Sequence, residues 1–310
     1  MQSAGEHEAE VRGRSNGKSA SDHVLTDWFR FVTHPDLEPG DHSLKVTIRN
    51  FFKLYYFNIL AMFAILFLVA VAQFFFKLEQ IPFPNQSPGK TLILVAVLSV
   101  VEEVFFRLPL RYRPFNLALP VGLALTVSVM FLLKTMHLHL PIWGRFITIV
   151  LLIALPTLLV YLALRFTYLN EILQRAFKRR FTIIFYFLNI TFALLHFSNY
   201  RHFNTASYLI APIVTLPQLL TGLNLSYLRI RHGFLWGALY HIFWNMVLFS
   251  TILNKSNPQY GLELMVGVTV FGLLLALLLP VQLGRKKESP PSMLPEGDIS
   301  SATEPPPVNE

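Results

Sequence analysis

The sequence contains no cysteine, and charged residues make up only 14% of its 310 positions. The absence of cysteine excludes disulfides, thiol nucleophiles and thiolate metal ligands. So little charge beside 53% hydrophobic residues and 28 phenylalanines is not typical of a soluble domain. Repeated apolar segments of about 20 residues instead predict an all-α, polytopic membrane protein. The net charge of +8 does not indicate nucleic-acid binding, because the basic residues lie mostly between the apolar segments.

The apolar segments predict a helical bundle of about eight transmembrane helices. The expected spans cover about 54–76, 89–110, 115–134, 145–165, 180–197, 206–228, 232–251 and 261–284. Basic residues gather at every second connection, which places both termini in the cytoplasm by the positive-inside rule. One such run, Lys178–Arg180, is expected to meet anionic lipid headgroups.

The chain divides by composition into three regions. Residues 1–50 form a polar cytoplasmic region, partly disordered, whose Trp28, Phe29 and Phe31 are expected to lie against the membrane. Residues 51–284 form the transmembrane domain. Residues 285–310 are rich in proline and polar residues, which predicts a disordered cytoplasmic tail.

Two adjacent glutamates lie near the end of the apolar segment 92–107. An ionisable group at a helix centre costs about 2.5–3.5 kcal/mol on insertion scales, so each needs a partner or a function. Glu103 precedes Arg107 by four residues, which favours an ion pair on one helix face. Glu102 is rotated from it by about 100°, toward another helix or a cavity. We expect Glu103 to be structural and Glu102 to be reactive, with two structural carboxylates as the alternative.

Two further spans carry polar residues where polarity is costly. His196 lies one turn after Phe192 in the fifth span, and His241 and Asn245 follow Gly237 at intervals of four in the seventh. An imidazole and a carboxamide can both donate hydrogen bonds to a developing oxyanion. Taken singly, each of these residues is explained equally well by hydrogen bonding between helices, which contributes about 0.6 kcal/mol in membrane proteins.

Together these groups suggest hydrolysis without a covalent enzyme intermediate. A carboxylate and an imidazole can hold and deprotonate a water molecule, while a second imidazole and an amide stabilise the tetrahedral intermediate. Straight helices would nevertheless separate them in depth. Glu102 lies within about 12 Å of the cytoplasmic end of its span, and His196 about 24 Å along the fifth span from Arg180.

The ordered motifs also resemble those of a known family. The resemblance is to the CAAX protease and bacteriocin-processing family (CPBP or Abi), which includes the Ras-converting CAAX endopeptidases, and it covers residues 89–250. It is carried by Glu102-Glu103-x-x-x-Arg107, Phe192-x-x-x-His196 and His241-x-x-x-Asn245. The resemblance implies an intramembrane endopeptidase acting on a peptide or protein at the bilayer. The breadth of the family points to the plasma (inner) membrane of a bacterium.

The resemblance also implies a role for each motif residue. Glu102 and His196 would bind and activate the water, and His241 and Asn245 would form the oxyanion site. The supporting residues would be Glu103, Arg107 and Phe192. Nothing in the sequence indicates that prenylated substrates are used.

Two alternatives use the same residues differently. A zinc ion held by Glu102, His196 and His241, with a water in the fourth position, would make a metalloprotease. The sequence lacks the H-E-x-x-H pair typical of such sites, so zinc ranks second and no other cofactor is expected. The other alternative is a membrane scaffold, immunity protein or transporter-like protein that uses the polar residues for packing or proton movement.

Overall fold

A computed structural model describes residues 24–40, 43–81, 88–135, 141–166, 168–201 and 205–256. The predicted eighth span, the proline-rich tail and residues 1–23 lie outside these ranges. The helices are α2 (Val24–Thr33), α3 (Leu44–Phe76), α4 (Pro88–Phe106), α5 (Pro114–Thr135), α6 (Ile142–Arg165), α7 (Leu169–Arg179), α8 (Phe181–Leu195), α9 (Ala211–Val214), α10 (Leu216–Arg231) and α11 (Phe234–Ser256), with 3₁₀ turns η1 (Leu108–Leu110), η2 (His196–Asn199) and η3 (Thr205–Ile210). The strands β1 (Glu79–Gln80) and β2 (Tyr200–Arg201) form one short antiparallel pair. The predicted all-α fold is confirmed for the described residues.

Four helices are long and apolar enough to cross a membrane: α3, α5, α6, and α8 with η2. A fifth span results if α9 and α10 are counted together. Two of the helices that were expected as spans, α4 and α11, fall short of this standard within the described residues. α4 carries Lys90, Glu102 and Glu103, and the apolar stretch of α11 is the shorter Phe234–Phe249. The count of eight spans is therefore only partly supported.

The predicted sixth span, 206–228, is not one continuous helix. It divides into η3, α9 and α10, with a bend of 48° between the last two at Thr215. Proline stands in the first turn of both α9 and α10, as Pro212 and Pro217. Proline cannot donate a backbone hydrogen bond, so it starts a helix readily but does not continue one. At the break the Ala211 carbonyl accepts from both the backbone N–H and the hydroxyl of Thr215, at 3.1 and 2.8 Å.

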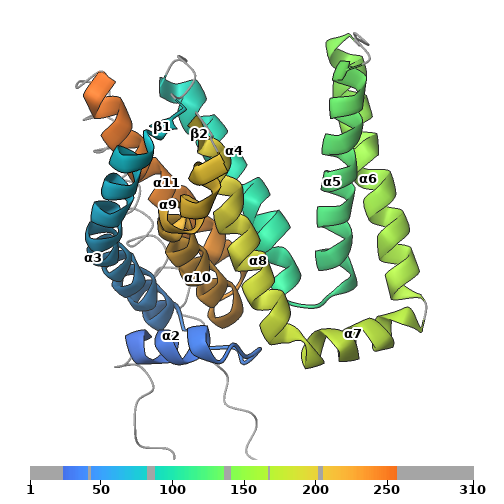
Figure 1. Cartoon of the computed structure of the whole chain (residues 1–310). Coiled ribbons are helices and arrows are strands. Elements are labelled where there is room, and N and C mark those ends of the chain that lie inside the picture. The colour runs from blue at the N-terminus through green and yellow to red at the C-terminus, as the bar shows by residue number, and fades with distance from the viewer. Residues whose placement is uncertain are drawn as a thin grey trace, which may run out of the picture.

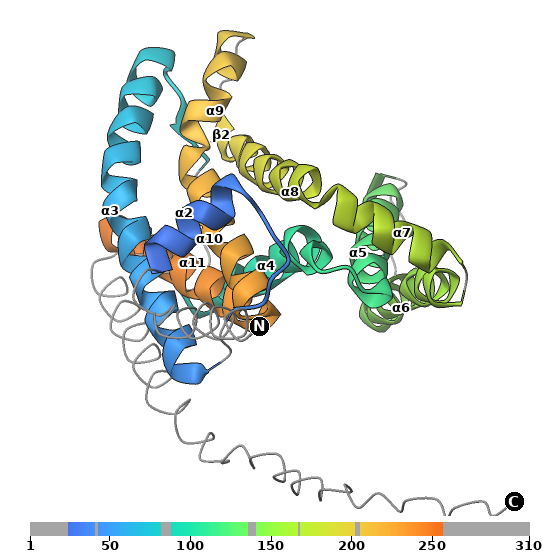
Figure 2. The same cartoon turned by 90° about the horizontal axis from the view of Figure 1, so that it is seen from below.

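The described helices form a main bundle and a separate hairpin. α3, α4, α8, α9, α10 and α11 pack around one another, while α5 and α6 pack chiefly against each other. Figures 1 and 2 show the hairpin standing apart, joined to the bundle by α7 and by the short segment 111–113. Gly122 sits at the closest approach of the hairpin helices, since a Cβ there would lie 2.9 Å from the Ile153 carbonyl oxygen.

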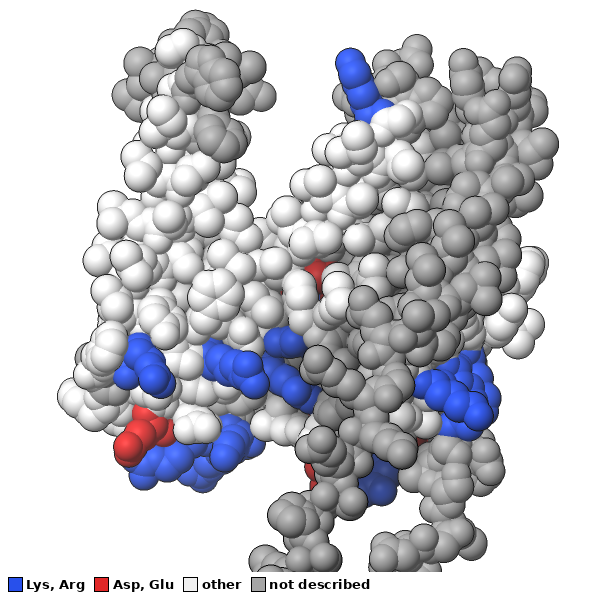
Figure 3. All heavy atoms as spheres, turned by 180° about the vertical axis from the view of Figure 1, so that it is seen from behind, with Lys and Arg blue, Asp and Glu red and all other residues white. Residues whose placement is uncertain are grey.

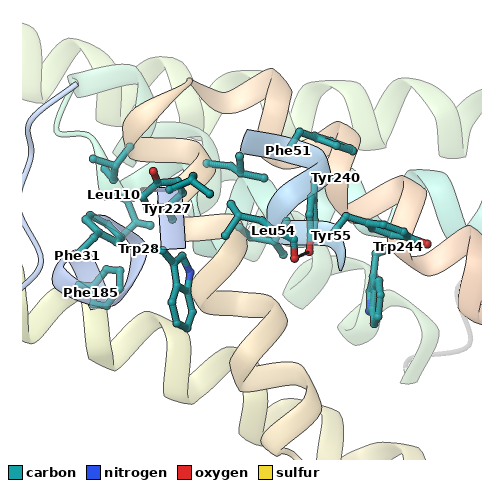
Figure 4. Packing of buried hydrophobic residues seen from close by; sticks show 14 of the residues in the cluster. Trp28, Phe31, Phe51, Leu54, Tyr55, Leu110, Phe185, Tyr227, Tyr240 and Trp244 are labelled. Carbon is teal, nitrogen blue, oxygen red and sulfur yellow. Dashed lines mark hydrogen bonds between the residues drawn. The ribbon is translucent and has the colours of Figure 1, made fainter. Parts of the chain in front are cut away.

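α2 closes one end of the bundle beneath α3 and α10. Trp28 and Phe31 are buried, at 3% and 0% exposed, in the cluster that Figure 4 shows around Leu54, Tyr227 and Tyr240. The expectation that both aromatic side chains lie against the membrane is wrong, because protein covers them. Phe29 points outward and is 54% exposed.

Polar contacts hold α2 against the end of α10. The Arg231 guanidinium pairs with Asp27 at 3.3 Å and donates to Asp36 at 3.0 Å. The Tyr227 hydroxyl donates to Asp27 at 2.8 Å. These contacts fix the end of α10, the helix that packs behind the candidate site.

Candidate active site

α4 and α11 meet along two stripes of residues spaced by four. On α4 the stripe contains Ser99 and Glu103, and on α11 it contains Gly237, His241 and Asn245. The Asn245 amide donates to the Ser99 hydroxyl at 2.9 Å, and the His241 Nδ1–H donates to Glu103 Oε1 at 3.0 Å. A Cβ on Gly237 would lie 3.3 Å from Glu103 Oε2, so the glycine lets the carboxylate approach. The side chains that the sequence marked on separate spans thus form consecutive contacts between two helices.

The Glu103 carboxylate is fully buried and has two partners. Its Oε1 lies 3.7 Å from Arg107 Nε, which confirms the ion pair expected from their spacing, and it also accepts the hydrogen bond from His241. Arg107 and His241 are 1% and 2% exposed. A buried carboxylate requires such compensation, because the cost of taking an ion out of water is several kcal/mol.

Glu102 faces the other nitrogen of the same imidazole. Its Oε2 lies 3.4 Å from His241 Nε2, and its side chain is 34% exposed, whereas Glu103 has no exposed surface. Glu102 is thus the more exposed of the two carboxylates, and its reactive role stays a prediction. The sequence did not predict that both would contact one histidine, His241.

A hollow opens between the α5–α6 hairpin and the bundle. Figure 3 shows it from behind, with an acidic side chain at its floor and an uncharged surface around it. α4 lines the bundle side of this hollow, and of its two glutamates only Glu102 has exposed surface. A molecule entering from the hairpin side could therefore reach this carboxylate.

His196 comes to the same site through the slant of α8. This helix runs obliquely from α7 into the bundle (Figure 1), whereas the depth comparison from the sequence assumed straight helices. His196 is close enough to Glu102 and to His241 for their charges to interact with it. Its Nδ1 lies 2.8 Å from the Phe192 carbonyl oxygen, which can only accept, so this nitrogen carries the proton. In the neutral ring Nε2 is then an acceptor.

Phe192 joins the parts of the site through its ring. The Arg107 guanidinium lies over the ring, with Cζ 3.8 Å from its centroid. The rings of His196 and His241 meet it edge to face, with centroids 4.7 and 5.9 Å away. Such aromatic and cation–π contacts contribute about 0.5–2 kcal/mol each and also orient the rings.

α10 supplies residues that sequence reasoning missed. Arg229 donates to the carbonyls of Arg107 and Leu108 at 3.1 and 3.3 Å, which satisfies acceptors just past the end of α4. A Cβ on Gly222 would lie 2.8 Å from Arg107 Nη2, so glycine makes room for the guanidinium. The sequence could have indicated Ser99, because Ser99, Glu103 and Arg107 follow one another at intervals of four residues. No sequence pattern indicated Gly222 or Arg229.

The described residues contain no cluster of three His, Asp or Glu side chains arranged to hold a metal ion. Both nitrogens of His241 face carboxylates, and Nδ1 of His196 is occupied by a backbone carbonyl. The zinc site considered from the sequence, on Glu102, His196 and His241, therefore lacks geometric support.

Comparison with protein-family models, with curated proteins and with solved structures found no match for this chain. What can be said of its chemistry therefore rests on the residues and their geometry.

Proposed function

We propose that this chain is an intramembrane endopeptidase that hydrolyses a peptide bond with a water molecule activated by Glu102. The observation that carries the proposal is the His241 imidazole between two carboxylates, one fully buried and one open to the hollow. Charged and imidazole groups in an apolar helix bundle are costly, and a site of this composition is a functional candidate by default.

In the proposed reaction Glu102 removes a proton from water while His196 Nε2 accepts its second hydrogen bond. The water oxygen bonds to the peptide carbonyl carbon, and the carbonyl electron pair moves onto oxygen. When the intermediate collapses, the carbonyl re-forms and the C–N bond breaks. Glu102 returns its proton to the departing nitrogen, so the carboxylate acts first as general base and then as general acid.

His241 and Asn245 are proposed to stabilise the oxyanion. Glu102, Glu103 and Arg107 carry one net negative charge when ionised, which an imidazolium at His241 balances. Its Nδ1–H is held by Glu103 and its Nε2 faces Glu102, so Nε2–H turns to the oxyanion once Glu102 has taken the proton from water. Asn245 uses one amide hydrogen on Ser99 and has a second available.

We further propose eight membrane spans with both termini in the cytoplasm of a bacterium. Four or five spans are supported by length and apolarity. α4 and α11 would complete the bundle, with Glu103, Arg107 and His241 covered by protein and Glu102 facing the hollow. The segment 261–284, outside the described residues, would form the last span. The substrate is then a peptide or protein at the bilayer that enters through the hollow.

The test compares new protein termini in cells that carry wild type, Glu102→Gln or Glu171→Gln. Glu171 is an exposed glutamate on α7, so its substitution makes the same chemical change away from the site. We expect a set of termini in wild type and Glu171→Gln that falls about 100-fold or more in Glu102→Gln. Matching profiles from a folded, abundant Glu102→Gln protein would favour a non-enzymatic scaffold.

A further inference from the structure

α7 is an amphipathic helix whose apolar face is largely uncovered. At 100° per residue its apolar positions fall within an arc of about 140°. They are Leu169, Ile172, Leu173, Ala176 and Phe177. Leu169, Ile172 and Leu173 are 43%, 46% and 38% exposed. In a water-soluble protein such a face would pack against the core, but here the described residues leave most of it open.

The covered part of that face sets the position of the helix. Phe177 packs against the rings of Tyr112 and Phe181, with centroids 5.7 and 5.8 Å away. The Tyr112 hydroxyl donates to the Asn170 carbonyl at 3.1 Å. Figures 1 and 2 show α7 lying across the end of the molecule, between the ends of α6 and α8. Because both neighbours are long and apolar enough to span a bilayer, α7 lies at the level where the apolar interior ends.

The opposite face of α7 is basic. Its exposed cations are Arg175, Lys178 and Arg179, followed by Arg180, with Glu171 as the single acid. Figure 3 shows basic side chains in a band across this end of the molecule, below a largely uncharged surface. Each Lys or Arg near an anionic membrane surface contributes about 1 kcal/mol of attraction.

We propose that α7 lies in the membrane interface and binds anionic phospholipid headgroups. Its open leucine and isoleucine side chains enter the acyl boundary, and its cations contact the headgroup phosphates. A lipid surface fits better than a protein partner, because the chain enters α7 from one span and leaves it into another. The bilayer boundary is thus already beside the apolar face. This inference rests on the membrane topology proposed above but not on the protease activity.

Lipid binding at α7 bears on the hollow beside Glu102. α7 and the segment 111–113 are the connections that join the α5–α6 hairpin to the bundle. A helix held in the headgroup layer keeps the two connected ends at one level.

The depth of α7 is tested with nitroxide labels on the full chain in vesicles of phosphatidylcholine with 30% phosphatidylglycerol. The natural chain has no cysteine, so single labels need no background substitutions. Ile172→Cys reports the apolar face, Gln174→Cys the polar face, and Leu155→Cys, 58% exposed on α6, the span itself. We expect oxygen to broaden the Ile172 and Leu155 labels and a water-soluble nickel complex to broaden the Gln174 label.

These labels separate failure of the inference from failure of the topology. A Leu155 label exposed to nickel would overturn the membrane topology, and the inference with it. The other outcome is a Leu155 label in lipid together with Ile172 and Gln174 labels that nickel broadens equally. That result would overturn the interfacial position of α7 and leave the membrane topology standing. Either result leaves the termini experiment to decide the protease separately.

The lipid preference is tested by native mass spectrometry after release from mixed bilayers. Wild type is expected to retain phosphatidylglycerol over phosphatidylcholine, and Lys178→Gln/Arg179→Gln to lose that preference several-fold. Lys45→Gln/Lys53→Gln removes the same charge from exposed positions on α3 and serves as the control. An equal loss in both double variants, or none in the α7 variant, would overturn specific binding at α7.

Discussion

The main bundle and the α5–α6 hairpin use their polar side chains in different ways. In the bundle, some polar groups bond within their own helix, but others bond across helices, as in Asn245 with Ser99 and His241 with Glu103. In the hairpin, the Thr126 and Ser128 hydroxyls donate to carbonyls four residues back in their own helix, at 2.7 and 2.9 Å. Bonds between helices depend on the relative position of both partners, whereas bonds within one helix do not.

This difference indicates that the bundle, which contains the candidate site, needs a fixed arrangement of its helices. A hydrolytic site requires its groups to stay within about 0.5 Å of the productive arrangement. The bundle meets that need with contacts between α4, α8, α10 and α11, including the Asn189 carboxamide, which accepts from Ser226 at 3.0 Å. The hydrogen bonds of Thr126 and Ser128 in the hairpin stay within α5 and do not fix its position against the bundle.

The strongest test of this contrast is the removal of a buried charge. Arg107→Ala leaves the Glu103 carboxylate buried beside His241 alone and removes the cation over the Phe192 ring. We expect a loss of about 3–5 kcal/mol in the free energy of unfolding in mild detergent. Arg165→Ala, at the exposed end of α6, should cost less than about 1 kcal/mol. Similar losses in both variants would remove the distinction between bundle and hairpin.

Packing in the hairpin can be broken separately. Gly122→Ala places a Cβ 2.0 Å from Thr157 Oγ1 and 2.9 Å from a backbone carbonyl of α6, so the two helices must separate. We expect a cost of about 1–3 kcal/mol, with faster hydrogen exchange in α5 and α6 and unchanged exchange in α11.

Gly89→Ala provides the control for that experiment. A Cβ there has nothing within 4 Å, and alanine favours a helix over glycine by about 1 kcal/mol. This substitution should be neutral or stabilising. Exchange that rises in α11 as much as in α5 after Gly122→Ala would show that the hairpin and the bundle are one cooperative unit.

Residue spacing along one helix predicted contacts between residues of that same helix. The interval of four gave the pair of Glu103 and Arg107, found at 3.7 Å, and the turn of 100° gave Glu102 a different exposure. Spacing could not predict that both carboxylates contact His241. That result depends on the rotation and register of α11 against α4, which no periodicity within either helix encodes.

Two other differences have similar causes. The tilt of α8 brings His196 to the site, and tilt is set by neighbouring helices rather than by the residues of the span. The break at Thr215 had a local signal in Pro212 and Pro217, but the sequence does not decide between a tolerated proline and a bend of 48°. The helix α4 was expected as a span from its length and apolarity, but it misses the standard that α3, α5 and α6 meet because it carries three charged residues.

A smaller effect distinguishes two serines. Ser99→Ala removes the acceptor of the Asn245 amide and should cost about 1 kcal/mol. Ser128→Ala removes only an exposed hydroxyl bonded within α5 and should change the free energy of unfolding by less than about 0.5 kcal/mol. If Asn245 also binds the oxyanion, Ser99→Ala should lower kcat more than it changes KM. A larger loss for Ser128→Ala would contradict the assignment of interhelical bonds to the bundle.

The smallest effect concerns pH and the attachment of α2. Partial burial acts to raise the pKa of Asp36, but hydrogen bonds from Arg231 and the Glu38 N–H, with the Arg231 charge, hold it below its ordinary value of 3.8. A lowered folded-state pKa contributes stability above the unfolded value, and that stability is lost as the pH falls through the folded value.

We therefore expect hydrogen exchange of residues 24–40, corrected for intrinsic rates, to become faster below about pH 4. The free energy of local opening should fall by less than about 1 kcal/mol. The helices α5 and α6 carry no Asp or Glu, so their corrected exchange should not change over the same range. Asp36→Asn removes the titrating group and should flatten the response of residues 24–40. If the pH response of residues 24–40 is the same in Asp36→Asn, another acid causes it, and Asp36 makes no measurable contribution to the attachment of α2.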